Sequence, residues 1–73
     1  MKEEFEIRAM GFGELAQMYN PKVNPASASN MMRRWIQKSP SLKSELSNAG
    51  YRRFSKMLTP RQVLLIVEYL GDP

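Results

Sequence analysis

Five prolines divide the 73-residue chain into short segments. Proline has no backbone N–H and restricts the residue before it, so it ends helices or occupies their first position. Asn20-Pro21 ends one helical segment, whereas Pro25, Pro40 and Pro60 stand where new helices begin. The spacing therefore predicts one small domain built from several short helices.

Apolar residues recur at helical spacing between these breaks. One stripe, at i, i+3, i+4 and i+7, predicts a helix over residues 12–19. A second helix is expected over residues 25–38 and a shorter third one over 40–48, with Gly50 at the position of a C-terminal cap. The apolar stripe of the second helix consists of Ala28, Met32, Trp35 and Ile36.

The clearest local signal lies near the end of the sequence. Thr59 and Gln62 have the spacing of a capping box, and Leu58 and Val63 occupy the positions of a hydrophobic staple. These signals predict a helix over residues 60–70. Because this helix is apolar on nearly every side, we expect it at the centre of the core or with one face against a partner.

Two further segments have patterns typical of extended structure. In residues 5–9, the apolar side chains of Phe5, Ile7 and Ala9 alternate with polar ones, which indicates a short strand or arm with one apolar face. Residues 51–57 are basic and aromatic. We expect them to form a short strand or wing that pairs with residues 5–9.

The expected fold class is mainly α, a small winged helix-turn-helix-like domain of about four short helices with a minor two-stranded element. It spans residues 1–73, and residues 1–4 are expected to be frayed. The charged start of the chain does not resemble a signal peptide, and the longest apolar run, Val63 to Val67, is too short to cross a bilayer. We therefore expect a cytoplasmic protein with no membrane partner.

The sequence contains neither cysteine nor histidine. Their absence excludes the usual zinc sites and the Ser-His and Cys-His nucleophiles. Glu14 and Glu68 are isolated carboxylates on predicted helices, and no general acid–base pair can be identified. We therefore expect no enzymatic activity, no cofactor, no metal and no small-molecule substrate.

Positive charge is concentrated in the middle of the chain. Residues 20–61 carry nine cations against Glu45 alone, a balance of +8, whereas residues 1–19 and 62–73 each carry −2. Clustered lysines and arginines are the main source of affinity for nucleic acid because their binding releases counterions. The segregation favours a surface that faces a polyanion. The alternative is a set of solvated cations whose anions come from elsewhere in the fold.

The second predicted helix has a polar and basic face opposite its apolar stripe. Arginine can bond guanine through two hydrogen bonds, and asparagine and glutamine can do the same with adenine. With its apolar side anchored by Trp35, this helix could lie in the major groove, although an ordinary solvated face would show the same pattern. The face consists of Asn30, Arg33, Arg34 and Gln37.

A second basic group follows Gly50 and is expected to hold the DNA backbone. Phosphate contacts fix the position of a protein on the duplex, whereas base contacts supply specificity. Double-stranded DNA is thus the expected partner. The expected DNA-binding residues are Asn30, Arg33, Arg34, Gln37, Lys38, Arg52, Arg53 and Lys56.

Two resemblances to known families follow from short motifs. The closer one, to a family of short single-domain bacterial proteins of unknown function, covers nearly the whole chain and implies no activity. Its motifs are Phe5-Glu6-Ile7-Arg8, Glu14-Leu15-Ala16, Trp35-Ile36, Pro40-x-Leu42, Gly50-Tyr51 and the stretch from Thr59 to Gly71.

The more distant resemblance is to winged helix-turn-helix domains of the mercury-resistance-regulator (MerR) and excisionase type. Gly13-Glu14-Leu15-Ala16 resembles the opening of their first helix, and the stretch from Gly50 to Ser55 resembles their wing. The resemblance implies that Arg52 and Arg53 contact phosphates. The longer connection over residues 20–30 departs from their tight turn. The chain also ends without their long dimerisation helix or effector domain, so neither feature is expected.

Two other functions remain open. The chain could be a protein-interaction module, in which the helix over 60–70 forms a homodimer or the basic middle meets an acidic partner. It could also bind RNA or single-stranded DNA if Trp35, Tyr51 or Phe54 proved exposed, because aromatic rings stack on unpaired bases.

Overall fold

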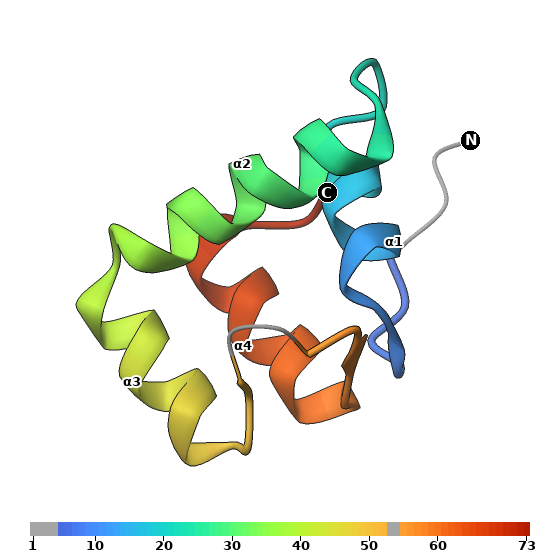
Figure 1. The fold of residues 1–73 in the computed structure, drawn as a ribbon. Coiled ribbons are helices and arrows are strands. Elements are labelled where there is room, and N and C mark those ends of the chain that lie inside the picture. Colours follow the sequence, from blue (N-terminus) through green and yellow to red (C-terminus); the bar gives the residue numbers. More distant parts are fainter. Residues whose placement is uncertain (1–4, 53–54) are drawn as a thin grey trace.

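The computed structural model describes residues 5–52 and 55–73, and it is mainly helical (Figure 1). All four helices that the sequence predicts are confirmed, each to within one residue of the predicted ends. The elements in chain order are β1 (Met10–Gly11), α1 (Phe12–Tyr19), α2 (Pro25–Gln37), α3 (Pro40–Asn48), β2 (Met57–Leu58) and α4 (Pro60–Leu70).

Side chains just before the helices explain where α2 and α3 begin. The Asn24 carboxamide oxygen accepts a hydrogen bond of 2.8 Å from the backbone N–H of Ser27. The Ser39 hydroxyl oxygen accepts a longer one of 3.5 Å from the N–H of Leu42. Each cap satisfies a backbone donor that has no partner inside the helix, and each stands directly before a proline at the first helical position.

The capping box of α4 is confirmed and also connects α4 to α3. Thr59 Oγ1 accepts from the N–H of Gln62 at 3.2 Å, and Gln62 Oε1 accepts from the N–H of Thr59 at 3.0 Å. Gln62 Nε2 then donates to the carbonyl oxygen of Ala49, at the end of α3, at 2.9 Å. Gln62 is buried, so these bonds satisfy an amide that would otherwise be costly to bury.

The two strands form a short antiparallel ribbon in which Met10 pairs with Leu58 and Gly11 with Met57. The predicted pairing of residues 5–9 with 51–57 is therefore wrong, because residues 5–9 form no strand.

The side of the chain that faces the core was also predicted wrongly. Met10 is buried, whereas Ala9 is exposed and Ile7 is 38% exposed. Phe12 points into the core at the start of α1. Side chains alternate between the two sides of an extended chain, so Met10, two positions earlier, points to the same side. Of the predicted apolar face, only Phe5 packs against the core, where it is partly buried.

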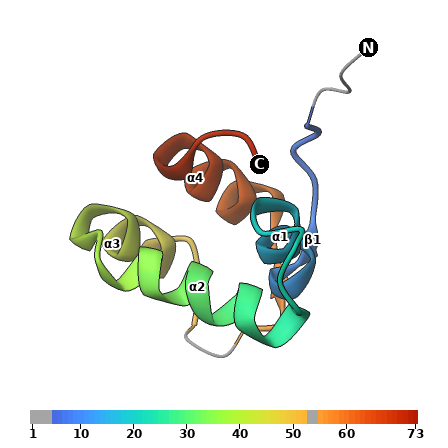
Figure 2. The same ribbon diagram turned by 90° about the horizontal axis from the view of Figure 1, so that it is seen from above.

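One hydrophobic core lies between the helices. Figure 2 shows α2 and α4 on opposite sides of the molecule, with α1 and α3 between them. The most extensive contact between elements joins α1 to α2. The buried apolar residues are Met10, Phe12, Leu15, Ala16, Ala28, Met32, Ile36, Leu42, Leu46, Leu58, Val63, Leu65 and Ile66.

Tyr19, at the end of α1, contacts both α2 and the residue that follows α4. Its ring meets Trp35 of α2 edge-on, with 6.1 Å between ring centroids and 85° between planes. Its hydroxyl donates to the carbonyl oxygen of Gly71, directly after α4. Trp35 is consequently only partly buried, at the margin of the core rather than within it.

Within the described residues, no helix has both the length and the apolar character needed to cross a membrane.

Candidate nucleic-acid interface

The outer face of α2 is polar and mostly open to solvent. Asn30, Arg34 and Gln37 are exposed, as the sequence predicts. Arg33 differs because it is partly buried. The predicted face is therefore present, but one of its two arginines is held against the body of the protein.

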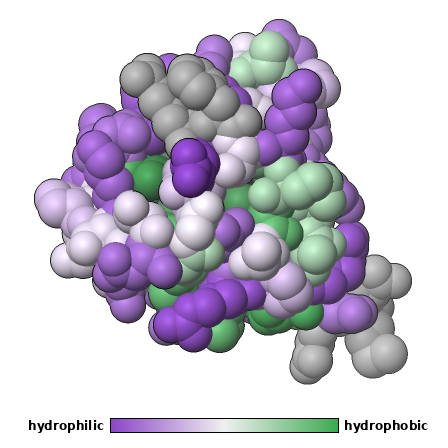
Figure 3. Space-filling view, turned by 60° about the horizontal axis from the view of Figure 1, so that its bottom comes forward, coloured by the Kyte–Doolittle hydropathy of each residue, from purple (hydrophilic) through white to green (hydrophobic). Residues whose placement is uncertain are grey.

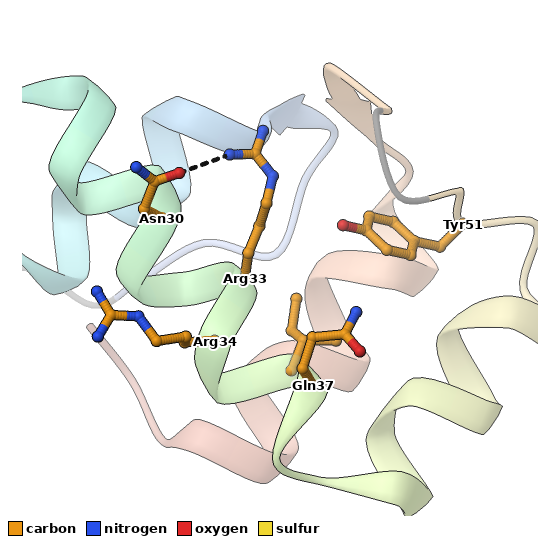
Figure 4. A pocket seen from close by; sticks show the side chains of 6 residues that line it. Asn30, Arg33, Arg34, Gln37 and Tyr51 are labelled. Atoms are coloured by element: carbon orange, nitrogen blue, oxygen red, sulfur yellow. Dashed lines mark hydrogen bonds between the residues drawn. The ribbon is translucent and has the colours of Figure 1, made fainter.

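A pocket of about 430 Å³ lies between this face and the segment that follows α3 (Figure 4). Tyr51 stands across the pocket from α2, with its hydroxyl directed toward the helix. The pocket thus gathers all four members of the predicted readout face. Its described lining contains no acidic side chain and consists of Asn30, Arg33, Arg34, Ile36, Gln37 and Tyr51.

Arg33 is positioned by an aromatic stack. Its guanidinium carbon lies 5.0 Å from the centroid of the Phe12 ring, within the range of a cation–π contact. The Phe12 ring stacks in turn on Tyr51, with 6.2 Å between centroids and 25° between planes. Three segments far apart in the sequence therefore hold one guanidinium group in place.

The same stack affects the phenol of Tyr51. Burial raises the pKa of Tyr51 because it disfavours the phenolate, and the nearby positive charge of Arg33 opposes that rise. The phenol is consequently neutral near pH 7 and can donate a hydrogen bond into the pocket.

Hydrogen bonding leaves part of the Arg33 guanidinium without a protein partner. Arg33 Nη1 lies 3.4 Å from the Asn30 side-chain oxygen, which is a long bond. Arg33 Nε is buried, and it has no acceptor among the residues that the structure describes. A guanidinium group carries five N–H donors, so Arg33 retains donors that an acceptor in the pocket could use.

Tyr51 reaches this position because the chain reverses sharply after α3. Gly50 adopts a φ of +90°, a conformation that residues with a Cβ rarely adopt. The N–H of Gly50 donates to the Ser47 carbonyl at 3.0 Å, and that of Tyr51 donates to the Leu46 carbonyl at 2.9 Å. These two hydrogen bonds form a Schellman motif, in which a glycine ends the helix, as the sequence predicts for Gly50.

The described residues that were predicted to hold the DNA backbone lie outside the pocket. Lys38 is the exposed C-cap of α2, and Arg52 and Lys56 are exposed as well. None of these three lines the pocket, while Arg53 lies outside the described residues.

Three hydrogen bonds fix the backbone near the residues predicted to hold the DNA backbone. The N–H of Ser55 donates to the Arg52 carbonyl at 2.9 Å, and the N–H of Arg52 donates to the Ser55 hydroxyl at 3.1 Å. The Lys56 carbonyl accepts from the N–H of Phe12 at 2.8 Å, which places Lys56 beside the start of α1.

Sequence reasoning missed two participants in this region. Tyr51 was treated as an aromatic neighbour of the cations, but it forms a wall of the pocket. Lys43, to which the sequence assigned no role, donates from Nζ to Gln37 Oε1 at 2.9 Å. The orientation of the Gln37 amide therefore depends on α3, which no pattern within the α2 sequence could indicate.

The middle cations are not neutralised by ion pairs within residues 5–52 and 55–73. The ion pair formed there joins Arg8 to Glu14, at 3.0 Å. The hydrogen bond from Arg8 holds the pKa of Glu14 below its ordinary value, and a bond from the N–H of Gly11 adds to the effect. Among the described residues, the anions near the ends of the chain thus form no ion pair with the cations of α2.

The fold and this surface define a small, mainly helical domain with a polar and basic face on α2. Over residues 6–73 the sequence matches the family described as a domain of unknown function (DUF4248), and the chain belongs to that family. Comparison with curated proteins and with solved structures gives no match.

Proposed function

We propose that this protein binds double-stranded DNA through the outer face of α2. The observation that supports this most strongly is the pocket, where two arginines and two carboxamides come together without an acidic side chain among the described lining residues. These are the side-chain types that bond base edges in the major groove. Arg52, Lys56 and Lys38 would contact phosphates around this centre.

The finer proposal is a winged helix-turn-helix domain of the MerR and excisionase type. The Gly13–Ala16 motif lies in α1, and α1 packs against α2, although the connection over residues 20–24 is longer than the tight turn of those domains. Tyr51, in the motif that resembles the wing, lies across the pocket from the outer face of α2, and the exposed Arg52 follows it in the chain. Such a role belongs in the bacterial cytoplasm, requires no catalysis and fits a small transcriptional regulator or excisionase-like factor.

The salt dependence of binding to a duplex provides the first test. Each phosphate contact contributes a slope of about −0.9 in a plot of log K against log salt concentration. If about five of the nine cations in residues 20–61 contact phosphate, the slope is about −4 to −5. Fluorescence anisotropy with a labelled random-sequence duplex measures it. No binding at low salt, or a flat dependence, would contradict the proposal.

Single substitutions separate base contacts from phosphate contacts. Arg34→Ala should relax the sequence preference obtained by selection from a random duplex pool, whereas Arg52→Ala should weaken binding to all sequences alike. Lys22→Ala is the matched control: it removes one exposed cation before α2, outside the proposed contact surface. Equal losses in all three variants would show unspecific electrostatic attraction in place of the proposed geometry.

A further inference from the structure

Helix α4 exposes a narrow ridge on the side away from the core. Arg61, Leu64 and Glu68 follow at i, i+3 and i+7, so they lie along one side of the helix. All three are exposed, and Leu64 is 41% exposed. Met57, in β2 just before α4, is 63% exposed. Figure 3 shows apolar patches among hydrophilic side chains on the face at the bottom of Figure 1.

The charges on this ridge complement those on the same ridge of a second copy of the protein. Arg61 and Glu68 are equidistant from the midpoint between Leu64 and Leu65, about 5 Å along the helix axis in each direction. When a second α4 packs antiparallel across that midpoint, Arg61 of each copy meets Glu68 of the partner subunit. Neither residue forms an ion pair within the part of the chain that the structure describes.

We propose that α4 is the contact surface of a symmetric antiparallel homodimer, with Leu64 at its centre. A two-fold axis requires a patch that matches itself, and the order Arg61, Leu64, Glu68 provides one. A parallel pair would instead place like charges side by side. This inference does not depend on DNA binding. Because α2 and α4 lie on opposite sides of the molecule, such a dimer leaves both α2 faces uncovered (Figure 2).

The mass of the protein in solution tests this directly, without DNA. The ridge of one short helix buries less than a standard interface, so we expect a dissociation constant of about 10–100 µM. Sedimentation equilibrium up to about 500 µM should then approach twice the 8.4 kDa mass of one chain. Leu64→Lys should remain at 8.4 kDa throughout. Leu64 is exposed, and circular dichroism verifies that this variant folds.

Charge reversal tests the antiparallel arrangement. Arg61→Glu and Glu68→Arg each place like charges together at two symmetric points, and each should weaken the dimer about tenfold. The double variant R61E/E68R should recover the wild-type affinity. An equimolar mixture of the two single variants should form a heterodimer, because each chain then carries the charges that complement the other.

Three outcomes would overturn the proposal. Wild-type protein that is monomeric at about 500 µM excludes this dimer. A dimer that persists in Leu64→Lys uses another surface. A dimer that Leu64→Lys abolishes but that the two single charge reversals leave unchanged does not have the antiparallel register.

Discussion

Helices α2 and α4 begin in the same way but expose very different surfaces. Each follows a side-chain cap and has proline at its first position. In α4, a capping box, a buried amide and three buried apolar residues fix the helix on the fold. In α2, three apolar residues suffice to anchor a longer helix. The comparison teaches that α4 is fixed by core contacts together with a buried amide and exposes a narrow ridge, whereas α2 exposes a polar and basic face.

The largest difference between the two helices should appear in stability. Ile66→Ala removes a fully buried side chain of α4, and we expect a loss of about 3–4 kcal/mol in the free energy of unfolding. Arg34→Ala, on the exposed face of α2, should change it by less than about 0.5 kcal/mol. Urea denaturation followed by circular dichroism measures both. Similar losses in the free energy of unfolding for the two variants would show that the outer face of α2 matters to stability as much as the core face of α4.

The buried amide that joins α4 to α3 gives the next largest effect. Gln62→Ala leaves the Ala49 carbonyl and the Thr59 N–H without their side-chain partner, and should cost about 2 kcal/mol. Gln62→Glu preserves an acceptor for Thr59 but turns a carboxylate oxygen toward a carbonyl, so it should not restore stability. The matched control is Gln37→Ala on α2, whose exposed amide contacts Lys43. If Gln37→Ala proved equally destabilising, the exposed amide of α2 would be as important to the fold as the buried one of α4.

Gly50 affects both stability and the geometry of the α2 face. Ala at position 50 would be strained at a φ of +90°, and we expect a loss of about 1 kcal/mol together with displacement of Tyr51 from Phe12. Gly13→Ala is the control, because Gly13 is helical and a Cβ there meets the Ser29 hydroxyl at an ordinary 3.5 Å. It should be neutral or slightly stabilising. Thermal unfolding compares the two, and near-ultraviolet circular dichroism reports the environment of Tyr51.

Tyr19 provides a smaller, pH-dependent effect. Burial, assisted by the negative charge of Asp72, raises the pKa of Tyr19 from 10.0 to about 12. The folded protein therefore retains a proton that the unfolded chain loses near pH 10, so this contribution to stability is complete below pH 10 and is lost as the pH rises toward 12. Because the phenol is only partly buried, solvent screening limits the loss to about 1 kcal/mol.

Substitution of Tyr19 isolates its contribution to the pH dependence of stability. Tyr19→Phe should unfold with a weaker dependence on pH between 10 and 12 than the wild type does. Urea denaturation at a series of alkaline pH values gives both profiles. Parallel profiles would show that Tyr19 does not couple the end of α4 to α1.

The helices could be predicted because their signals are local. Proline positions, the caps at Asn24 and Thr59 and the spacing of apolar residues depend on neighbours a few positions away. The polar face of α2 is local in the same sense, since a helical repeat alone places Asn30, Arg34 and Gln37 together. These features require no knowledge of what the helix packs against.

The remaining features depend on contacts between distant segments. Alternation in residues 5–9 could not show that the inward register is set by Phe12. No pattern in α2 distinguishes Arg33 from Arg34. Only the fold brings Phe12 under one guanidinium group and, through the reversal at Gly50, places Tyr51 across the pocket.

The contacts between the first and last helices also affect how the chain folds during synthesis. Met10 pairs with Leu58, and the bond from Tyr19 to Gly71 spans 52 positions. A nascent chain can pair Met10 with Leu58 once β2 has left the ribosome, but it cannot form the bond from Tyr19 to Gly71 until α4 has emerged as well. Until then, α1 and α2 can pack against each other, but the core lacks the apolar side chains of α4 and remains accessible to chaperones. The domain should consequently fold as one unit after α4 emerges, rather than helix by helix from the N-terminus.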